Sequence, residues 1–180
     1  MKVKFYNAID DKLIKFAVII SKSNGKWVFC KHRERDTYEI PGGHRENGET
    51  IDITAKRELQ EETGAKEFMI SPICVYSVTG RNRVNETGEE TYGMLFFADI
   101  KEFDDELHSE IEKIVLFDEL PSEWTYPSIQ PLLIEEYQRR LENKIGNRYG
   151  VKINRKTRVA EENSLFNYEF VKPKNIYAGS

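Results

Sequence analysis

Hydrophobic and polar residues alternate along several segments with the two-residue period of β-strands. The alternation predicts strands over residues 16–21, 26–32, 38–40, 67–78, 92–100 and 113–117. Asn24-Gly25, between the first two segments, is a strong signal for a tight hairpin. The pattern predicts a chain in which strands are interrupted by two helices.

The first predicted helix follows Thr50. Ile51, Ala55 and Leu59 recur at every fourth position, so they form one apolar stripe. Thr50 is a suitable N-cap, because its hydroxyl can accept from the first free amides of the helix. Gly64 is suited to stop the helix, because glycine adopts the left-handed conformation without steric cost.

The second helix is expected over residues 128–143, with Ser128 as N-cap and Pro131 in the first turn, where proline is tolerated. One compact domain is expected over residues 1–143. The tail, residues 144–180, is expected to be an appended basic segment, since it holds eight Lys and Arg against three Glu. The total charge is −4, which leaves −9 on the domain.

Three glutamates gather on another face of the first helix. Glu58, Glu61 and Glu62 stand at positions i, i+3 and i+4, where like charges repel by a few tenths of a kcal/mol per pair, about 0.2–0.5. A bound cation would remove this repulsion, and carboxylate oxygens favour Mg²⁺, Mn²⁺ or Ca²⁺. The alternative is a solvated helix that is merely rich in glutamate.

The turn before the helix, Pro41-Gly42-Gly43, also suits a ligand site. Two glycines let the backbone approach a ligand closely, and a free carbonyl there can add a metal ligand. Arg57 lies next to Glu58 in sequence and can orient a carboxylate through a charge-assisted hydrogen bond.

Together these residues form the spacing Gly43-x5-Glu49-x7-Arg57-Glu58-Leu59-x-Glu61-Glu62-x-Gly64-Ala65. This spacing resembles the box of the Nudix hydrolase family at every charged and glycine position. Ala65 departs slightly, because the family usually has a larger aliphatic residue there. The flanks are similar to the family as far as about residue 142, and the segment 26–43 is similar to the branch that acts on purine nucleoside triphosphates.

The resemblance implies an α/β fold, a Nudix-type α/β/α sandwich around a mixed β-sheet. It implies Mg²⁺, with Mn²⁺ as a substitute, and cleavage of a nucleoside diphosphate linked to another group. It assigns a metal or catalytic role to a set of box positions: the Gly43 carbonyl as ligand, Glu58, Glu61 and Glu62 as metal carboxylates, Glu58 also as a candidate proton acceptor, Arg57 to position Glu58, and Glu49 in support.

A further acidic ligand often comes from a distal loop in this family. Glu110 is the first candidate here and Glu112 the second, because both precede the strand predicted near residue 113. The alternative is that both are solvated loop charges.

Four arginines are candidates for phosphate contacts. Arg33 and Arg35 follow a strand that should end near the box, and Arg81 and Arg83 lie in the long loop 80–90. A solvated turn and a mobile loop are the alternatives.

Three aromatic residues are candidates for stacking a nucleobase: Tyr38, Trp124 and Tyr126. The alternative is packing against the sheet. His32 is a weaker candidate than the glutamates for a general base. Cys30 and Cys74 are expected to be buried thiols.

The N-terminal segment has no signal-peptide core and no apolar run is long enough to span a membrane, so a cytoplasmic protein is expected. The expected function is Mg²⁺-dependent hydrolysis of a nucleoside triphosphate, such as an oxidised guanine nucleotide. The alternatives are an ADP-ribose, dinucleotide or RNA 5′-end pyrophosphohydrolase and a non-catalytic nucleotide-binding module. For the tail, packing on its own domain is favoured over nucleic-acid binding, and strands exchanged in a homodimer are a further alternative.

Overall fold

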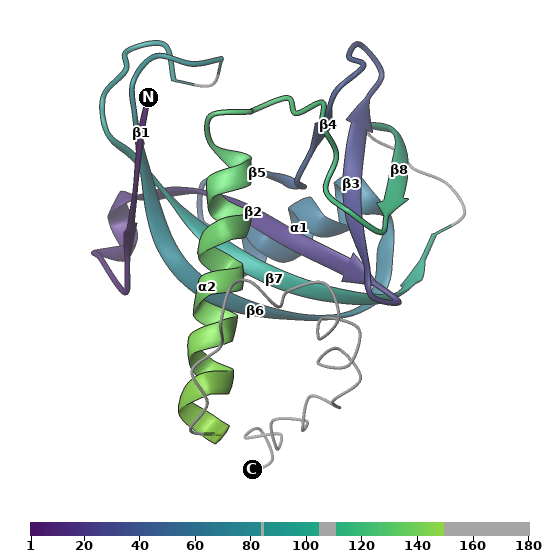
Figure 1. The fold of residues 1–180 in the computed structure, drawn as a ribbon. Coiled ribbons are helices and arrows are strands. Elements are labelled where there is room, and N and C mark those ends of the chain that lie inside the picture. The colour runs from purple at the N-terminus through teal and green to yellow at the C-terminus, as the bar shows by residue number, and fades with distance from the viewer. Residues whose placement is uncertain (84, 105–110, 150–180) are drawn as a thin grey trace, which may run out of the picture. The chain divides into compact units, whose positions relative to one another are not determined.

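The structure, a computed structural model, describes residues 1–83, 85–104 and 111–149 (Figure 1). The chain divides into two units, Met1–Arg140 and Leu141–Ser180, and the fold and site described below belong to the first. Within the described ranges, no helix has the length and apolar character that a membrane crossing requires.

The described residues build a mixed sheet with one helix on each face. Its strands follow the order β1-β6-β7-β2-β3-β4, with β5 paired to β2 and β8 to β3. Only the pairing of β2 with β7 is parallel among the described strands, and the other pairs are antiparallel. The elements are β1 (Lys2–Tyr6), η1 (Asp11–Leu13), β2 (Ile14–Ser23), β3 (Lys26–His32), β4 (Tyr38–Glu39), β5 (Gly42–His44), α1 (Ile51–Thr63), β6 (Ala65–Thr79), β7 (Thr91–Phe103), β8 (Ile111–Phe117) and α2 (Gln130–Tyr149).

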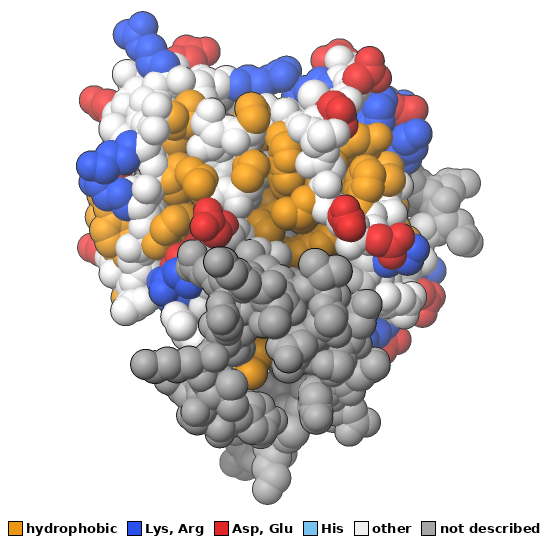
Figure 2. Space-filling view, in the orientation of Figure 1, with side chains coloured by type: hydrophobic (Ala, Val, Ile, Leu, Met, Phe, Trp, Pro, Cys, Tyr) orange, Lys and Arg blue, Asp and Glu red, His pale blue; other side chains and the backbone are white. Residues whose placement is uncertain are grey.

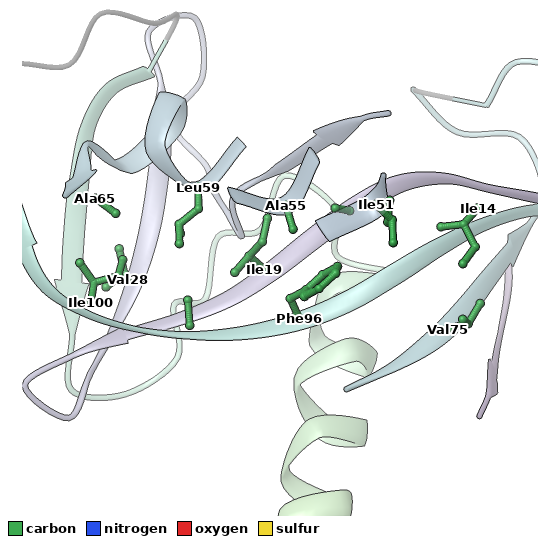
Figure 3. Packing of buried hydrophobic residues seen from close by; sticks show 12 residues of the cluster. Ile14, Ile19, Val28, Ile51, Ala55, Leu59, Ala65, Val75, Phe96 and Ile100 are labelled. Atoms are coloured by element: carbon green, nitrogen blue, oxygen red, sulfur yellow. The ribbon is translucent and has the colours of Figure 1, made fainter. Parts of the chain in front are cut away.

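The apolar stripe of α1 forms the core against the sheet, as the periodicity predicts. Ile51, Ala55 and Leu59 are buried and pack in one cluster with Ile19 and Phe96 (Figure 3). Burial of a leucine of this kind contributes about 1.5–3 kcal/mol. The stripe therefore fixes which side of α1 faces the sheet and which side is left for polar residues.

Both predicted ends of α1 are confirmed. The Thr50 hydroxyl accepts from the amide of Ile53 at 3.3 Å, and Gly64 has φ 69° and ψ 21°, the left-handed conformation. The hairpin at Asn24-Gly25 is confirmed as well, with φ values of 51° and 81°.

The part of α2 that belongs to the first unit, as far as Arg140, lies on the opposite face of the sheet from α1 (Figure 1). Tyr137 stacks on Phe97 with ring centroids 4.9 Å apart and meets Trp27 edge-on at 6.5 Å. Figure 2 shows that hydrophobic side chains gather in the middle of this face and charged ones mostly at its rim. The α/β/α sandwich expected from the resemblance is confirmed.

The structure corrects the start of α2. The helix begins at Gln130, two residues later than expected, and Ser128 lies in the turn before it. The amides of Ile129 and Gln130 both donate to the carbonyl of Tyr126, at 3.1 and 3.0 Å, so a turn closed on Tyr126 precedes the helix. Strands β1 and β5 were not expected, because each is short and is held by pairing with a distant strand.

Candidate active site

The site begins where the glycine turn of β5 meets α1. Gly43 pairs with Ala17 of β2 and lies directly against the side chain of Glu58. A Cβ atom at Gly43 would fall inside the carboxylate of Glu58, so a side chain there would displace that carboxylate. The second glycine of the turn therefore lets a buried carboxylate contact the backbone of the turn.

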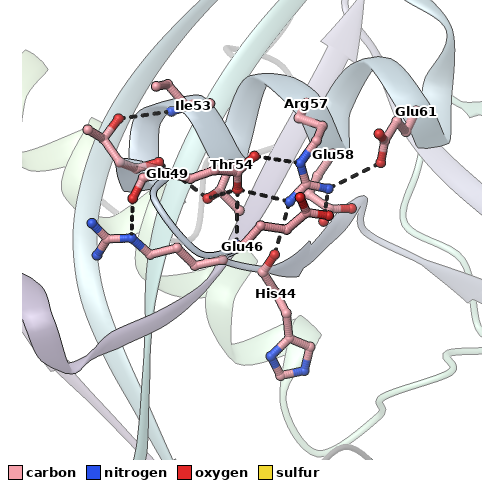
Figure 4. A network of polar contacts seen from close by, with 10 residues as sticks. His44, Glu46, Glu49, Ile53, Thr54, Arg57, Glu58 and Glu61 are labelled. Carbon is pink, nitrogen blue, oxygen red and sulfur yellow. Dashed lines mark hydrogen bonds and ion pairs between the residues drawn. The ribbon is translucent and has the colours of Figure 1, made fainter.

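Arg57 is the centre of a hydrogen-bonded network around this contact (Figure 4). Its Nε donates to Glu49 Oε1 at 2.8 Å, and its Nη1 donates to Glu58 Oε1 at 2.7 Å and to Glu61 Oε2 at 3.2 Å. Its Nη2 donates to the carbonyl of His44 at 3.0 Å and to Glu49 Oε2 at 3.1 Å. One guanidinium thus serves three carboxylates and ties α1 to β5.

Glu49 is the most strongly held carboxylate of the network. Its Oε2 also accepts from the Thr54 hydroxyl at 2.7 Å and from the Glu46 amide at 3.1 Å. The hydrogen bonds from Arg57, and next the one from Thr54, lower its pKa to about 2. An anion held by this many donors is suited to fix the loop before α1.

The three helix glutamates differ in their surroundings. Glu58 is only 9% exposed, and burial raises its pKa although Arg57 opposes the shift. The Glu61 side chain is 54% exposed. Glu62 Oε2 accepts from the amide of Gly42 at 2.8 Å, so it faces the same glycine turn as Glu58.

The donor set suits a hard divalent cation. Glu49, Glu58, Glu61 and Glu62 bring four negative charges to a neighbourhood in which Arg57 supplies one positive charge. Nevertheless, no three His, Cys, Asp or Glu side chains of the described ranges converge on one point as metal ligands do. Glu61 is turned to Arg57 and Glu62 to Gly42, so holding an ion requires these side chains to turn, which the exposure of Glu61 allows.

The candidate phosphate arginines lie in two different settings. Arg33 is exposed, whereas Arg35 is half-buried and donates from Nη1 to Glu39 Oε2 at 2.8 Å. Arg35 Nε is the one buried side-chain nitrogen or oxygen in the described part of the chain that has no hydrogen-bond partner. Sequence reasoning missed Glu39, because a spacing of four residues indicates a side-chain contact only within a helix, and Glu39 lies in β4.

The described residues of the loop 80–90 are held by local hydrogen bonds. Asn82 and Asn85 exchange backbone hydrogen bonds of 3.0 and 3.3 Å, and Arg83 directly follows the first of them in the chain. The Asn85 side chain accepts from the Gly88 amide at 3.0 Å and donates to the Glu89 carbonyl at 2.7 Å. Arg81 and Arg83 are both exposed.

The aromatic candidates include one that lies among charged candidates. Tyr126 is half-buried, and burial raises its pKa. Glu39 raises that pKa further, Arg35 and Arg83 lower it, and Glu62 raises it, so all four charges act on this phenol. These charged residues lie in different segments of the chain, so their influence on Tyr126 depends on the tertiary structure.

The other two aromatic candidates pack edge-on against neighbouring rings. Tyr38 meets Phe117 with ring centroids 4.9 Å apart, and Trp124 meets Phe29 at 5.2 Å. Both remain partly exposed. The amide of Tyr38 donates to the Glu123 carbonyl and the amide of Thr125 donates to the Tyr38 carbonyl, both at 2.9 Å, so the segment before Tyr126 runs beside β4.

Only one of the two distal acidic candidates lies among the described residues. Glu110 lies outside the described residues. Glu112 accepts from Lys31 Nζ at 2.6 Å, and this hydrogen bond lowers its pKa. His32 is buried, and Cys30 and Cys74 are buried free thiols, as expected.

Comparison with known proteins finds a relative that is similar in sequence. The Bacillus subtilis protein named "Putative 8-oxo-dGTP diphosphatase YtkD" is 35% identical over 104 residues, which are 57% of this chain and 61% of that protein. The chain thus spans less than two thirds of that relative's length.

Solved structures show the same fold. The B. subtilis pyrophosphohydrolase BsRppH, crystallised as a mutant, is 25% identical, with a TM-score of 0.62 over 77% of this chain and 90% of that one. A NUDIX hydrolase from Nitrosomonas europaea is 23% identical, with a TM-score of 0.57 over 71% and 90%. The family model described as the NUDIX domain matches residues 11–136. Since this match covers more than half of the chain, the chain belongs to the Nudix hydrolase family.

Proposed function

We propose that this protein hydrolyses a diphosphate bond of a nucleoside triphosphate with the help of Mg²⁺, which Mn²⁺ can replace. The observation that carries the proposal is the buried Glu58 carboxylate held between Gly43 and Arg57 in a neighbourhood with surplus negative charge. The carboxylates of Glu58, Glu61 and Glu62 and the carbonyl of Gly43 would hold the ion. When bound, it would neutralise charge on the phosphates and lower the pKa of water.

The chain's own residues supply the proton transfer. Water attacks phosphorus, the bridging P–O bond breaks, and the proton passes to Glu58 Oε2, the oxygen that the hydrogen bond from Arg57 leaves open. The raised pKa of Glu58 suits a proton acceptor at neutral pH. Arg57 holds the other oxygen at 2.7 Å and so keeps the carboxylate in a single orientation.

The substrate we propose is a (deoxy)nucleoside triphosphate such as an oxidised guanine nucleotide. The name of the Bacillus relative supports this choice. Tyr126, with Tyr38 and Trp124, would form the nucleobase wall, and the exposed Arg33, Arg81 and Arg83 would reach the phosphates. Arg35, which is tied to Glu39, would contact the nucleotide from within the wall.

The remaining features belong to the same proposal. We place the enzyme in the cytoplasm with a small-molecule substrate. The domain would end near residue 143, and the basic residues 144–180 would pack on it or on a second subunit.

A substrate panel tests the proposal. Oxidised and normal (d)NTPs, ADP-ribose, NADH, diadenosine polyphosphates and capped RNA are each incubated with Mg²⁺, and products are separated by chromatography. We expect triphosphates to be cleaved fastest, and Glu61→Gln to lower that rate by about 10²–10⁴-fold while staying folded. Turnover of ADP-ribose without any triphosphate would overturn the substrate, and a near-normal rate for Glu61→Gln would remove that residue from the site.

A further inference from the structure

Gln130, the first residue of α2, contacts a segment ninety positions away in sequence. Its side chain is 5% exposed, and its Oε1 accepts from the amide of Ile40 at 3.1 Å. Its Nε2 donates to the carbonyl of the same residue at 3.5 Å. One amide side chain thus serves both backbone groups of Ile40.

Ile40 needs this partner because of where it lies. It stands between β4, which ends at Glu39, and β5, which begins at Gly42, and it is only 4% exposed. A buried backbone group without a partner costs about 1–3 kcal/mol, so both groups require one. The next residue, Pro41, has no amide, and its carbonyl accepts from Ile19 at 2.8 Å.

The residues that follow are those of the candidate metal site. The amide of Gly42 donates to Glu62, and Gly43 lies against Glu58. The backbone that Gln130 and Ile19 hold thus leads directly into both glycines, which also pair with Val18 and Ala17 of β2.

We propose that Gln130 is a positioning residue that sets the Gly42–Gly43 turn, and with it the divalent-metal site. The proposal rests on the proposed function, because it concerns the same metal. Gln130 also links the metal site to the proposed nucleobase wall. Its backbone amide donates to the carbonyl of Tyr126, so the same residue contacts both Tyr126 and Ile40.

The test compares Gln130→Met with Ile134→Val. The first removes both hydrogen bonds to Ile40 at similar side-chain volume. The second is a matched control that weakens the packing of α2 at a residue 1% exposed and far from the turn in the chain. Mn²⁺ affinity is measured by electron paramagnetic resonance without nucleotide, and amide exchange at Ile40 and Gly42 by NMR.

We expect Gln130→Met to weaken Mn²⁺ binding by about 10-fold or more, the range seen when a residue that orients a ligand is lost. Exchange at Ile40 should accelerate beyond any change in global stability, and Ile134→Val should leave Mn²⁺ affinity unchanged. Mn²⁺ affinity within twofold of wild type in Gln130→Met, or equal losses in both variants, would overturn the proposal.

A second variant tests the proposal in case Gln130→Met folds poorly. Gln130→Glu keeps an acceptor for the Ile40 amide but loses the donor to its carbonyl, so an intermediate affinity is expected, and affinity equal to wild type would also overturn the proposal. If wild type binds Mn²⁺ but cleaves no nucleotide, only the proposed function fails. If it takes up no Mn²⁺ at all, both fail.

Discussion

Two carboxylate networks in this domain hold a glutamate equally firmly but differ in charge balance. At the β1 edge of the sheet, Glu90 Oε1 accepts from Lys4 Nζ at 2.9 Å, Tyr6 Oη at 3.1 Å and Ser77 Oγ at 2.7 Å. These donors, Lys4 first, lower the pKa of Glu90 to about 2. Glu49 of the box reaches the same value through Arg57 and Thr54.

The difference lies in how many acids share each cation. Glu90 has Lys4 as its partner, so that network is neutral and fastens β1 to β6 and β7. Arg57 serves Glu49, Glu58 and Glu61 at once. A strongly lowered pKa therefore does not mark a functional site by itself. In the proposed site, by contrast, carboxylates outnumber cations and one buried acid has a raised pKa.

The largest expected difference is in catalysis. Glu58→Gln should lower turnover by about 10²–10⁴-fold, because in the proposed mechanism it removes a proton acceptor and a metal carboxylate at once. Glu90→Gln, the matched change in the neutral network, should stay within about twofold of wild type, as expected for a group away from the reacting atoms. Steady-state rates at saturating Mg²⁺ measure both. Equal losses of turnover in both variants would show that charge balance does not distinguish a functional site from a structural ion pair.

A smaller difference is expected in metal-dependent stability. Arg57→Ala should lower the free energy of unfolding by about 2 kcal/mol, less than for a fully buried pair because the Arg57 side chain is 21% exposed. Millimolar Mg²⁺ should restore part of this loss, since a cation can replace the lost charge. Thermal unfolding with and without Mg²⁺ measures the effect. Lys4→Ala should show a loss that Mg²⁺ leaves unchanged, and equal recovery in both variants would contradict the comparison.

The smallest difference should appear in acid, where the two networks behave alike. The pKa of Glu49 and of Glu90 falls from the ordinary 4.5 to about 2 in the folded protein. The unfolded chain therefore binds more protons, so their contribution is full above about pH 4.5 and is lost as the pH falls through 2.

Denaturant titrations at a series of pH values between 5 and 2 check that the free energy of unfolding falls as the pH is lowered. Glu49→Gln and Glu90→Gln should each flatten the decline of stability relative to wild type. A variant that declines as steeply as wild type would show that its carboxylate keeps its ordinary pKa when folded.

Features that depend on neighbours in sequence could be predicted. The spacing of Ile51, Ala55 and Leu59 decided which face of α1 is buried, and it therefore also decided that Glu58, Glu61 and Glu62 lie away from the main core. Thr50 and Gly64 set the helix ends through bonds within one turn. Because the box is a local pattern, family and fold could be read from it.

Contacts between distant segments could not be predicted in the same way. Nothing near Gln130 in sequence indicates that its amide serves Ile40, and the pairing of β1 with β6 joins segments about seventy residues apart. The charges of Arg35, Arg83 and Glu62, which influence the pKa of Tyr126, likewise come from segments far apart in the chain.

The sequence by itself determined the chemistry available to this protein: which carboxylates, which arginine and which glycines meet around one helix. Only the tertiary structure decided their individual states, that Glu58 is buried, Glu61 exposed and Glu62 turned to Gly42. The physical reason is that helix periodicity orients side chains through local geometry, whereas desolvation and hydrogen bonding depend on what the folded chain brings against them.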